Sequence, residues 1–191
     1  MAKTLRMLTN GQVPDCIDCL DNLRMTILKW RTLEKIKRKG SPAVFVVCVG
    51  SELIEGWQDG AEADEWQGSG WLYLLECYPD LFPYITDTLQ ALGLQEMRAE
   101  FQGLFTLLPE LASFQEKSLD DAIDFLKDSN YEAYDVRLQR YSPEERIRMS
   151  ETFAAILERL ERLSEGEWGI EAPEEGWGGL LRYIEQNYDV A

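Results

Sequence analysis

The sequence contains no histidine among its 191 residues. This absence excludes histidine-dependent catalytic triads, histidine metal ligands and acid–base catalysis by imidazole. A Gly-rich phosphate-binding loop is missing as well, because the glycines near the middle of the chain lack the required spacing and a following lysine. These glycines are Gly56, Gly60, Gly68 and Gly70. Several common routes to an enzyme activity therefore do not apply to this chain.

Positive charge is absent over a long stretch. No Lys or Arg stands between Gly40 and Arg98, whereas positions 41–97 hold ten acidic residues. Repulsion between like charges weakens a compact chain, so a field of this size is best explained if it attracts something basic. The ten acids are Glu52, Glu55, Asp59, Glu62, Asp64, Glu65, Glu76, Asp80, Asp87 and Glu96.

The net charge of −16 is divided unevenly along the chain. Residues 1–40 hold nine bases and four acids, a net of +5, and residues 41–191 hold ten bases and 31 acids, a net of −21. An acidic protein repels phosphate groups, so we expect no direct binding of nucleic acid and no attraction to anionic membranes. The expected partner is a basic protein.

Long apolar runs are also absent. The longest, Ala43 to Val49, is far too short to cross a bilayer. Residues 1–15 lack the apolar core that a signal peptide needs. We therefore expect a cytoplasmic protein without a membrane span, in which the four Cys are reduced thiols rather than disulfides.

The composition, 45 % apolar and 11 % aromatic, is that of a globular protein. A chain of this length is enough for one domain with a proper core. We expect a single compact all-α domain over residues 1–191, with about seven to nine helices. It would consist of a basic N-terminal helix within 1–40 and an acidic helical body over 41–191.

Helical periodicity and capping signals predict the individual helices. The β-branched run from Val44 to Val49 also allows a short strand, but its apolar residues follow helical spacing, so we favour a helix over 43–58. The other helices are predicted over about 15–39, 71–78, 81–92, 95–108, 118–129, 131–139, 143–163 and 179–188. Asp15, Asp80, Ser118 (with Asp121) and Ser142 are their expected caps. Acidic, Gly-containing loops are expected over 58–70 and 164–179.

The sequence leaves two kinds of chemistry open, one at a cysteine pair and one at a pair of carboxylates. Cys16 and Cys19 form a C-x-x-C pair, which fits buried structural thiols, part of a zinc site or a redox pair. Structural thiols are favoured, because Cys16 lies on the apolar stripe of its predicted helix and acidic neighbours oppose thiolate formation. Hydrolysis by a carboxylate pair is the other open chemistry, although no pair stands out. We therefore assign no catalytic residue, metal or cofactor, and we do not expect an enzyme.

The stretch from Val44 to Pro109 has a characteristic order of motifs. An apolar helix ends in the acidic turn Glu52-Leu53-Ile54-Glu55-Gly56-Trp57, and later helices close in Ala91-Leu92-Gly93 and Leu107-Leu108-Pro109. This order resembles a bacterial family of acidic all-helical proteins of unknown function, which includes a DNA-mimic protein. The family's usual Asn-Gly-Gly-aromatic turn is replaced here by Glu55-Gly56-Trp57 followed by Gly60. The resemblance implies an α-helical fold and an acidic binding surface on a homodimer.

The candidate site is the acidic segment after the apolar run, together with the Trp side chains that interleave with it. Spacings of three and four residues on a helix place neighbouring Cβ atoms about 5–6 Å apart, which makes a row of anions. The site residues are Glu52, Glu55, Trp57, Asp59, Glu62, Asp64, Glu65 and Trp66. The alternatives are core packing for the Trp and a merely solvating role for the acids.

These residues indicate that the protein is an acidic module that docks on a basic surface of a partner. Its carboxylates would take the place of DNA phosphates and so block a nucleic-acid-binding protein. One alternative is an immunity protein that covers a basic toxin such as a nuclease. The second alternative is an unrecognised enzyme that uses a carboxylate pair.

Overall fold

The first described helix, α4 (Pro42–Glu62), contains the β-branched run whose conformation the sequence left ambiguous. The structure, a computed structural model, describes residues 42–63, 69–113 and 116–187. Val47 and Val49 lie on opposite sides of α4 and both are buried, as expected for a helix surrounded by packed neighbours. Tertiary packing thus overrides the strand propensity of this run. The predicted helix is confirmed, and it ends at 62 rather than at 58.

Three short helices and a 3-10 helix follow α4 in the chain. They are α5 (Gly70–Cys77), α6 (Phe82–Ala91), α7 (Gln95–Leu107) and η2 (Pro109–Ser113). The Ser69 hydroxyl caps α5 by accepting a hydrogen bond from the Leu72 N–H at 3.2 Å. The predicted bounds of α5, α6 and α7 hold to within a residue at each end. Asp80 is not the cap of α6, because the residue before that helix is Leu81, which makes no side-chain cap.

α8 (Glu116–Lys127) and the chain after it differ from the prediction. The helix begins before Ser118, so the expected capping box of Ser118 and Asp121 is wrong. The expected helix over 131–139 is wrong too, because residues 128–142 form turns and irregular chain. The buried carboxylate of Asp121 accepts the backbone N–H groups of Tyr134 at 2.9 Å and Asp135 at 2.8 Å. A side-chain acceptor has replaced the helical bonds that these amides would otherwise make.

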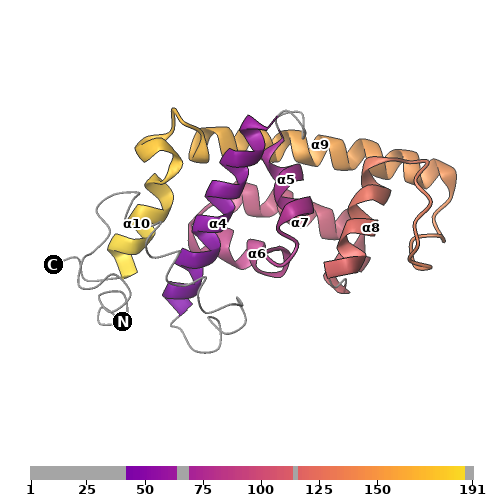
Figure 1. Cartoon of the computed structure of the whole chain (residues 1–191), viewed down its shortest axis with the longest axis horizontal. Helices are drawn as coiled ribbons and strands as arrows, with labels where there is room; N and C mark the ends of the chain where they lie inside the picture. Colours follow the sequence, from indigo (N-terminus) through magenta and orange to yellow (C-terminus); the bar gives the residue numbers. More distant parts are fainter. Residues whose placement is uncertain (1–41, 64–68, 114–115, 188–191) are drawn as a thin grey trace.

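The longest helix, α9 (Pro143–Trp168), runs along one side of the other helices (Figure 1). Its start was predicted correctly: the Ser142 hydroxyl accepts from the Glu145 N–H at 3.3 Å, and the Glu145 carboxylate accepts from the Ser142 N–H at 2.8 Å. It ends at Trp168 rather than at 163, so the second acidic loop is shorter than predicted. The 3-10 helix η3 (Pro173–Gly176) then leads to α10 (Gly178–Asn187).

The core joins all of these helices. α4 packs against α5, α6 and α10, and α9 packs against α7, α8 and α5. The largest fully buried side chains include Trp71 on α5, Phe101 on α7, Phe125 on α8 and Phe153 on α9. Each helix therefore contributes its apolar face to one continuous interior.

The predicted all-α fold class is confirmed. The described residues form seven α-helices and two short 3-10 helices, and no strand occurs among them. Within this described part, no helix combines the length and the apolar character needed to traverse a bilayer. The first predicted helix, over 15–39, lies outside the described residues.

Candidate protein-docking surface

The predicted site residues do not all lie on one surface. Glu52 and Glu55 are half-buried on α4, whereas Asp59 and Glu62 are exposed at its C-terminal end. Trp57 is buried, with 3 % of its surface exposed. Asp64, Glu65 and Trp66 lie outside the described residues. Among the described acids of the predicted row, the most exposed ones are therefore Asp59 and Glu62, in the last turn of α4.

Trp57 is a core residue, which corrects its assignment as a surface anchor. Its indole N–H donates to the Glu161 carboxylate at 2.7 Å, and its ring packs edge-on against Trp168 at a centroid distance of 6.3 Å. Two further tryptophans that the sequence placed near the acidic segments, Trp71 and Trp177, are buried as well. An indole that is buried and hydrogen-bonded in this way stabilises the fold and offers a partner no contact.

Glu161 holds the C-terminal half of α4 in place. Besides the Trp57 indole, its carboxylate accepts the Ser69 hydroxyl at 2.6 Å and the backbone N–H of Trp71 at 2.8 Å. The last of these bonds satisfies an amide in the first turn of α5, where a negative charge also suits the helix dipole. One carboxylate on α9 thus joins the end of α4 to the start of α5, and it fixes the direction in which α4 presents Asp59 and Glu62.

A second acidic segment lies against the same end of α4. The side-chain amide of Gln58 donates to the backbone carbonyls of Trp168 at 2.7 Å and Glu175 at 2.8 Å. Trp168 is the last residue of α9, and Glu175 lies within the connection between α9 and α10, which carries three exposed acids. They are Glu171, Glu174 and Glu175. We name these three residues, together with Asp59 and Glu62, the acidic surface.

The connection between α9 and α10 has a constrained backbone. Glu174 and Glu175 have positive φ angles of 54° and 53°, and Gly176 has a φ of 91°. Non-glycine residues in this left-handed region cost on the order of 1–3 kcal/mol each. A Cβ on Gly176 would lie 2.2 Å from the Trp168 carbonyl oxygen, so only glycine permits this close approach. The chain is thus held tightly against the end of α9, with the Glu174 and Glu175 side chains exposed.

No acid of the acidic surface takes part in the ion pairs that the described residues form. Lys127 neutralises Glu76, one of the ten acids of the base-free stretch, at 2.5 Å. The other ion pairs join Arg159 to Glu100, Arg137 to Asp135, Arg140 to Glu110 and Lys127 to Asp124. Two acidic segments that are distant in sequence are therefore joined through Gln58, and their exposed acids form no ion pair with a base of the described residues.

The negative charges of α4 also act on two neighbouring groups, one at the end of α5 and one on α4 itself. The pKa of Tyr78 is raised to about 12, mainly by burial and next by Tyr73, with further contributions from the charges of Glu52 and Asp59. Burial, assisted by the charge of Glu52, likewise raises the pKa of the Cys48 thiol to about 12. Both groups therefore stay neutral at physiological pH.

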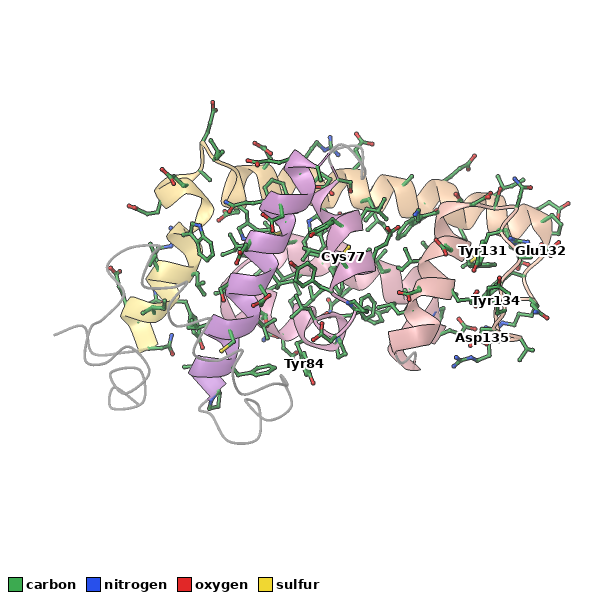
Figure 2. The ribbon with its side chains drawn as sticks, viewed as in Figure 1. Cys77, Tyr84, Tyr131, Glu132, Tyr134 and Asp135 are labelled. Atoms are coloured by element: carbon green, nitrogen blue, oxygen red, sulfur yellow. The ribbon has the colours of Figure 1, made fainter. Side chains whose placement is uncertain are left out.

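This difference in environment predicts which thiol reacts. Cys77 is exposed on α5 (Figure 2), whereas Cys48 is buried and stays protonated. In the native protein at neutral pH we expect N-ethylmaleimide to modify Cys77 and to leave Cys48 intact, because the thiolate is the nucleophile. Peptide mass mapping measures both sites in one sample. Modification of both thiols in guanidinium is the control, and native modification of Cys48 as fast as that of Cys77 would contradict the assignment.

No metal site is apparent in the described part of the chain. There, no group of three or more Cys, Asp or Glu side chains is arranged so that it could hold a metal ion. The C-x-x-C pair of Cys16 and Cys19 lies outside the described residues.

Sequence reasoning missed three parts of this surface. It identified the acids of the second loop but did not join them to α4, although one signal was present: no Lys or Arg stands between Arg162 and Arg182. It did not identify Gln58 or Glu161, whose partners lie about a hundred residues away. No local pattern marks such long-range partners.

The chain matches no family model, no curated protein and no solved structure. The resemblance to the acidic family with a DNA-mimic member therefore stays a prediction.

Proposed function

We propose that this chain is an acidic docking module whose acidic surface contacts a basic surface of a nucleic-acid-binding protein. The observation that carries the proposal is the meeting of two base-free acidic segments at the end of α4, joined through Gln58. In the complex the exposed carboxylates occupy positions that DNA phosphates would otherwise take. No catalytic residue is part of this proposal.

The physics of such a surface favours fast and salt-sensitive association. Uncompensated charges of one sign attract a partner of opposite charge over distances of about 10 Å at moderate salt, and this attraction raises the rate of encounter. Arg and Lys residues that bind phosphates also pair well with carboxylates. Because all the described Trp residues are buried, the acidic surface supplies mainly charge, and affinity should depend strongly on ionic strength.

A matched pair of charge-neutralised variants tests the proposal. The first carries Asp59→Asn, Glu62→Gln, Glu171→Gln and Glu174→Gln, all in the acidic surface. The control carries Asp80→Asn, Asp87→Asn, Glu96→Gln and Glu151→Gln, which removes four exposed acids elsewhere and gives the same net charge. The immobilised wild-type protein captures its partner from a host extract, and the purified partner is then titrated against all three proteins.

We expect the first variant to bind the partner at least about tenfold more weakly, and the control to stay within about twofold of wild type. Binding should fall steeply as salt is raised, and excess duplex DNA should release the partner, because it competes for the same basic surface. Equal loss in both variants, or binding that is indifferent to salt, would contradict the proposal.

The same experiment separates the proposed function from that of an immunity protein. If the captured protein is a basic toxin, such as a nuclease, and loses activity in the complex, the surface serves as an inhibitor of that toxin. The homodimer implied by the family resemblance stays a prediction, which light scattering of the purified protein tests.

A further inference from the structure

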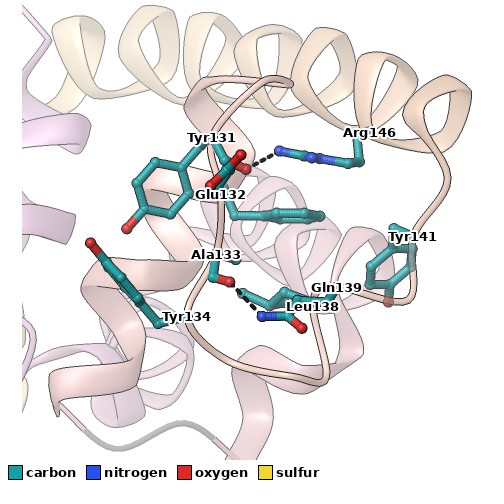
Figure 3. A pocket seen from close by; sticks show the side chains of 9 residues that line it. Tyr131, Glu132, Ala133, Tyr134, Leu138, Gln139, Tyr141 and Arg146 are labelled. Atoms are coloured by element: carbon teal, nitrogen blue, oxygen red, sulfur yellow. Dashed lines mark hydrogen bonds between the residues drawn. The ribbon is translucent and has the colours of Figure 1, made fainter.

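A cavity of about 470 Å³ lies at the end of the molecule occupied by α8, between that helix, the irregular segment 128–142 and the start of α9 (Figure 3). The proposed docking function does not use it, because the acidic surface lies at the end of α4 and on the connection between α9 and α10, away from α8 (Figure 1). Its volume is within the range of roughly 300–1,000 Å³ that is typical of small-molecule sites. The lining residues that matter here are Phe125, Tyr131, Tyr134, Tyr141 and Arg146.

The irregular segment around the cavity is held open by side-chain bonds. Asp121 accepts the Tyr131 hydroxyl at 3.1 Å in addition to the two backbone N–H groups that it takes from residues 134 and 135. The Gln139 amide donates to the Ala133 carbonyl at 2.9 Å (Figure 3). A compact, well-bonded surface loop of this length is a frequent location of function. Here the bonds fix the aromatic side chains around a space that no side chain of the loop fills.

Arg146 brings an uncompensated positive charge to this cavity. Its guanidinium lies over the Phe125 ring, 5.1 Å from the centroid, and its Nη2 donates to the Tyr131 carbonyl. Its Nε is buried and has no hydrogen-bond partner. No acidic side chain pairs with Arg146 among the described residues, whereas Arg137 and Arg140 nearby each have a carboxylate partner. A guanidinium that is partly desolvated and lacks an anion is an unfavourable arrangement that a bound carboxylate would relieve.

The mouth of the cavity carries apolar surface that the fold leaves exposed. Tyr134, which lines the cavity, is 85 % exposed, and Figure 2 shows it with Tyr131 and Glu132 in the segment that follows α8. Exposed aromatic groups beside a cavity favour a ligand with a flat apolar face. Glu132 is exposed and also lines the cavity. Its charge disfavours a ligand with several negative charges, such as a nucleotide.

We propose that this cavity binds a small aromatic monocarboxylate, with its carboxylate against the Arg146 guanidinium and its ring between the aromatic side chains of the segment 131–141. The cation supplies the charge recognition, since a guanidinium matches the planar carboxylate group. Tyr134 covers the ring from the solvent side. The proposal is independent of the docking function, because the two surfaces share no residue.

Three aromatic acids serve as probes: benzoate, phenylacetate and indole-3-acetate. Each is titrated at up to millimolar concentration into the full chain by calorimetry, and ligand contacts are followed by saturation-transfer NMR. The neutral amide of each acid is the matched ligand. The variants are Arg146→Met, Tyr134→Ala and the control Arg162→Met, which removes an exposed arginine in the second half of α9.

We expect at least one of the acids to bind saturably, and its amide to bind about tenfold more weakly or worse. Arg146→Met should weaken binding of the acid by at least about tenfold, and Tyr134→Ala should weaken it by several-fold. Arg162→Met should leave binding unchanged. Because Tyr134 is exposed, we expect Tyr134→Ala to keep the fold. If Arg146→Met does not fold, binding of the acid to Tyr134→Ala tests the proposal. The proposal is overturned if no acid binds at millimolar concentration, if acid and amide bind equally, or if Tyr134→Ala and a folded Arg146→Met bind like wild type.

Discussion

Replacing Glu161 with alanine should lower the free energy of unfolding by about 3–4 kcal/mol, because one carboxylate satisfies three donors. The change leaves the Trp57 indole, the Ser69 hydroxyl and the Trp71 backbone N–H without their acceptor. Hydrogen bonds to a charged group are stronger than neutral ones, and donors in a partly buried site regain little solvation. Urea denaturation monitored by tryptophan fluorescence measures the loss.

Two further variants test whether the loss of stability comes from the hydrogen bonds and the charge of Glu161. Glu161→Gln keeps an acceptor oxygen but loses the charge, and we expect it to cost about 1–2 kcal/mol. Glu158→Ala removes an exposed acid one turn earlier on α9 and should change stability by no more than about 0.5 kcal/mol. If Glu161→Ala proved no more harmful than Glu158→Ala, the assigned role of Glu161 in joining α4 to α5 would be wrong.

Gly70→Ala should destabilise the protein by about 3 kcal/mol, at the upper end of the usual cost of overpacking. A Cβ at this position would lie 2.4 Å from both the Trp57 carbonyl oxygen and the Trp57 Cδ1 atom. The clash involves the backbone of α4, so no rotation of a flexible side chain relieves it. Gly60 faces the same contact from α4, where a Cβ would lie 2.4 Å from the Cβ of Tyr73. The two helices approach closely because neither residue has a side chain.

The control for Gly70→Ala is a substitution of the same kind with the opposite expected sign. Gly166 lies within α9, and a Cβ there would meet nothing within 4 Å. Gly166→Ala should therefore raise stability by roughly 0.5–1 kcal/mol through its helix propensity alone. Thermal denaturation of the wild type and of the two variants measures both effects, when their free energies of unfolding are compared at the same temperature. Equal effects of the two substitutions would show that the approach of α4 to α5 is looser than described.

The acidic surface depends on the same two contacts. Asp59 and Glu62 lie at the end of α4 that Glu161 and Gly70 hold, and Gln58 joins that end to the connection between α9 and α10. The arrangement of charge is therefore a consequence of core packing around α4. A variant that loosens this packing should weaken both stability and docking, whereas the variant that neutralises four acids of the acidic surface should affect docking alone.

The irregular segment 128–142 illustrates why some local predictions failed. Its residues carry no strong helix breaker, so a short helix was a reasonable expectation for 131–139. The conformation of this segment is instead determined by Asp121, a residue of α8 that the sequence pattern predicted to be part of a helix cap. Its carboxylate accepts two backbone amides and a tyrosine hydroxyl, and a buried charge bonded in this way outweighs the weak helix propensity of a short segment.

The sequence by itself determined the fold class, the positions of most helices and the sign of the charge on the protein, because periodicity, caps and composition are local properties of the chain. The capping box at Ser142 and the helix over the Val44–Val49 run are examples. Only the tertiary structure decided that Trp57 lies in the core, that Glu161 joins α4 to α5, and that Gln58 joins the end of α4 to the connection that carries Glu175. Each of these depends on contacts between residues about a hundred positions apart, and such contacts form only when several helices bury their apolar faces together.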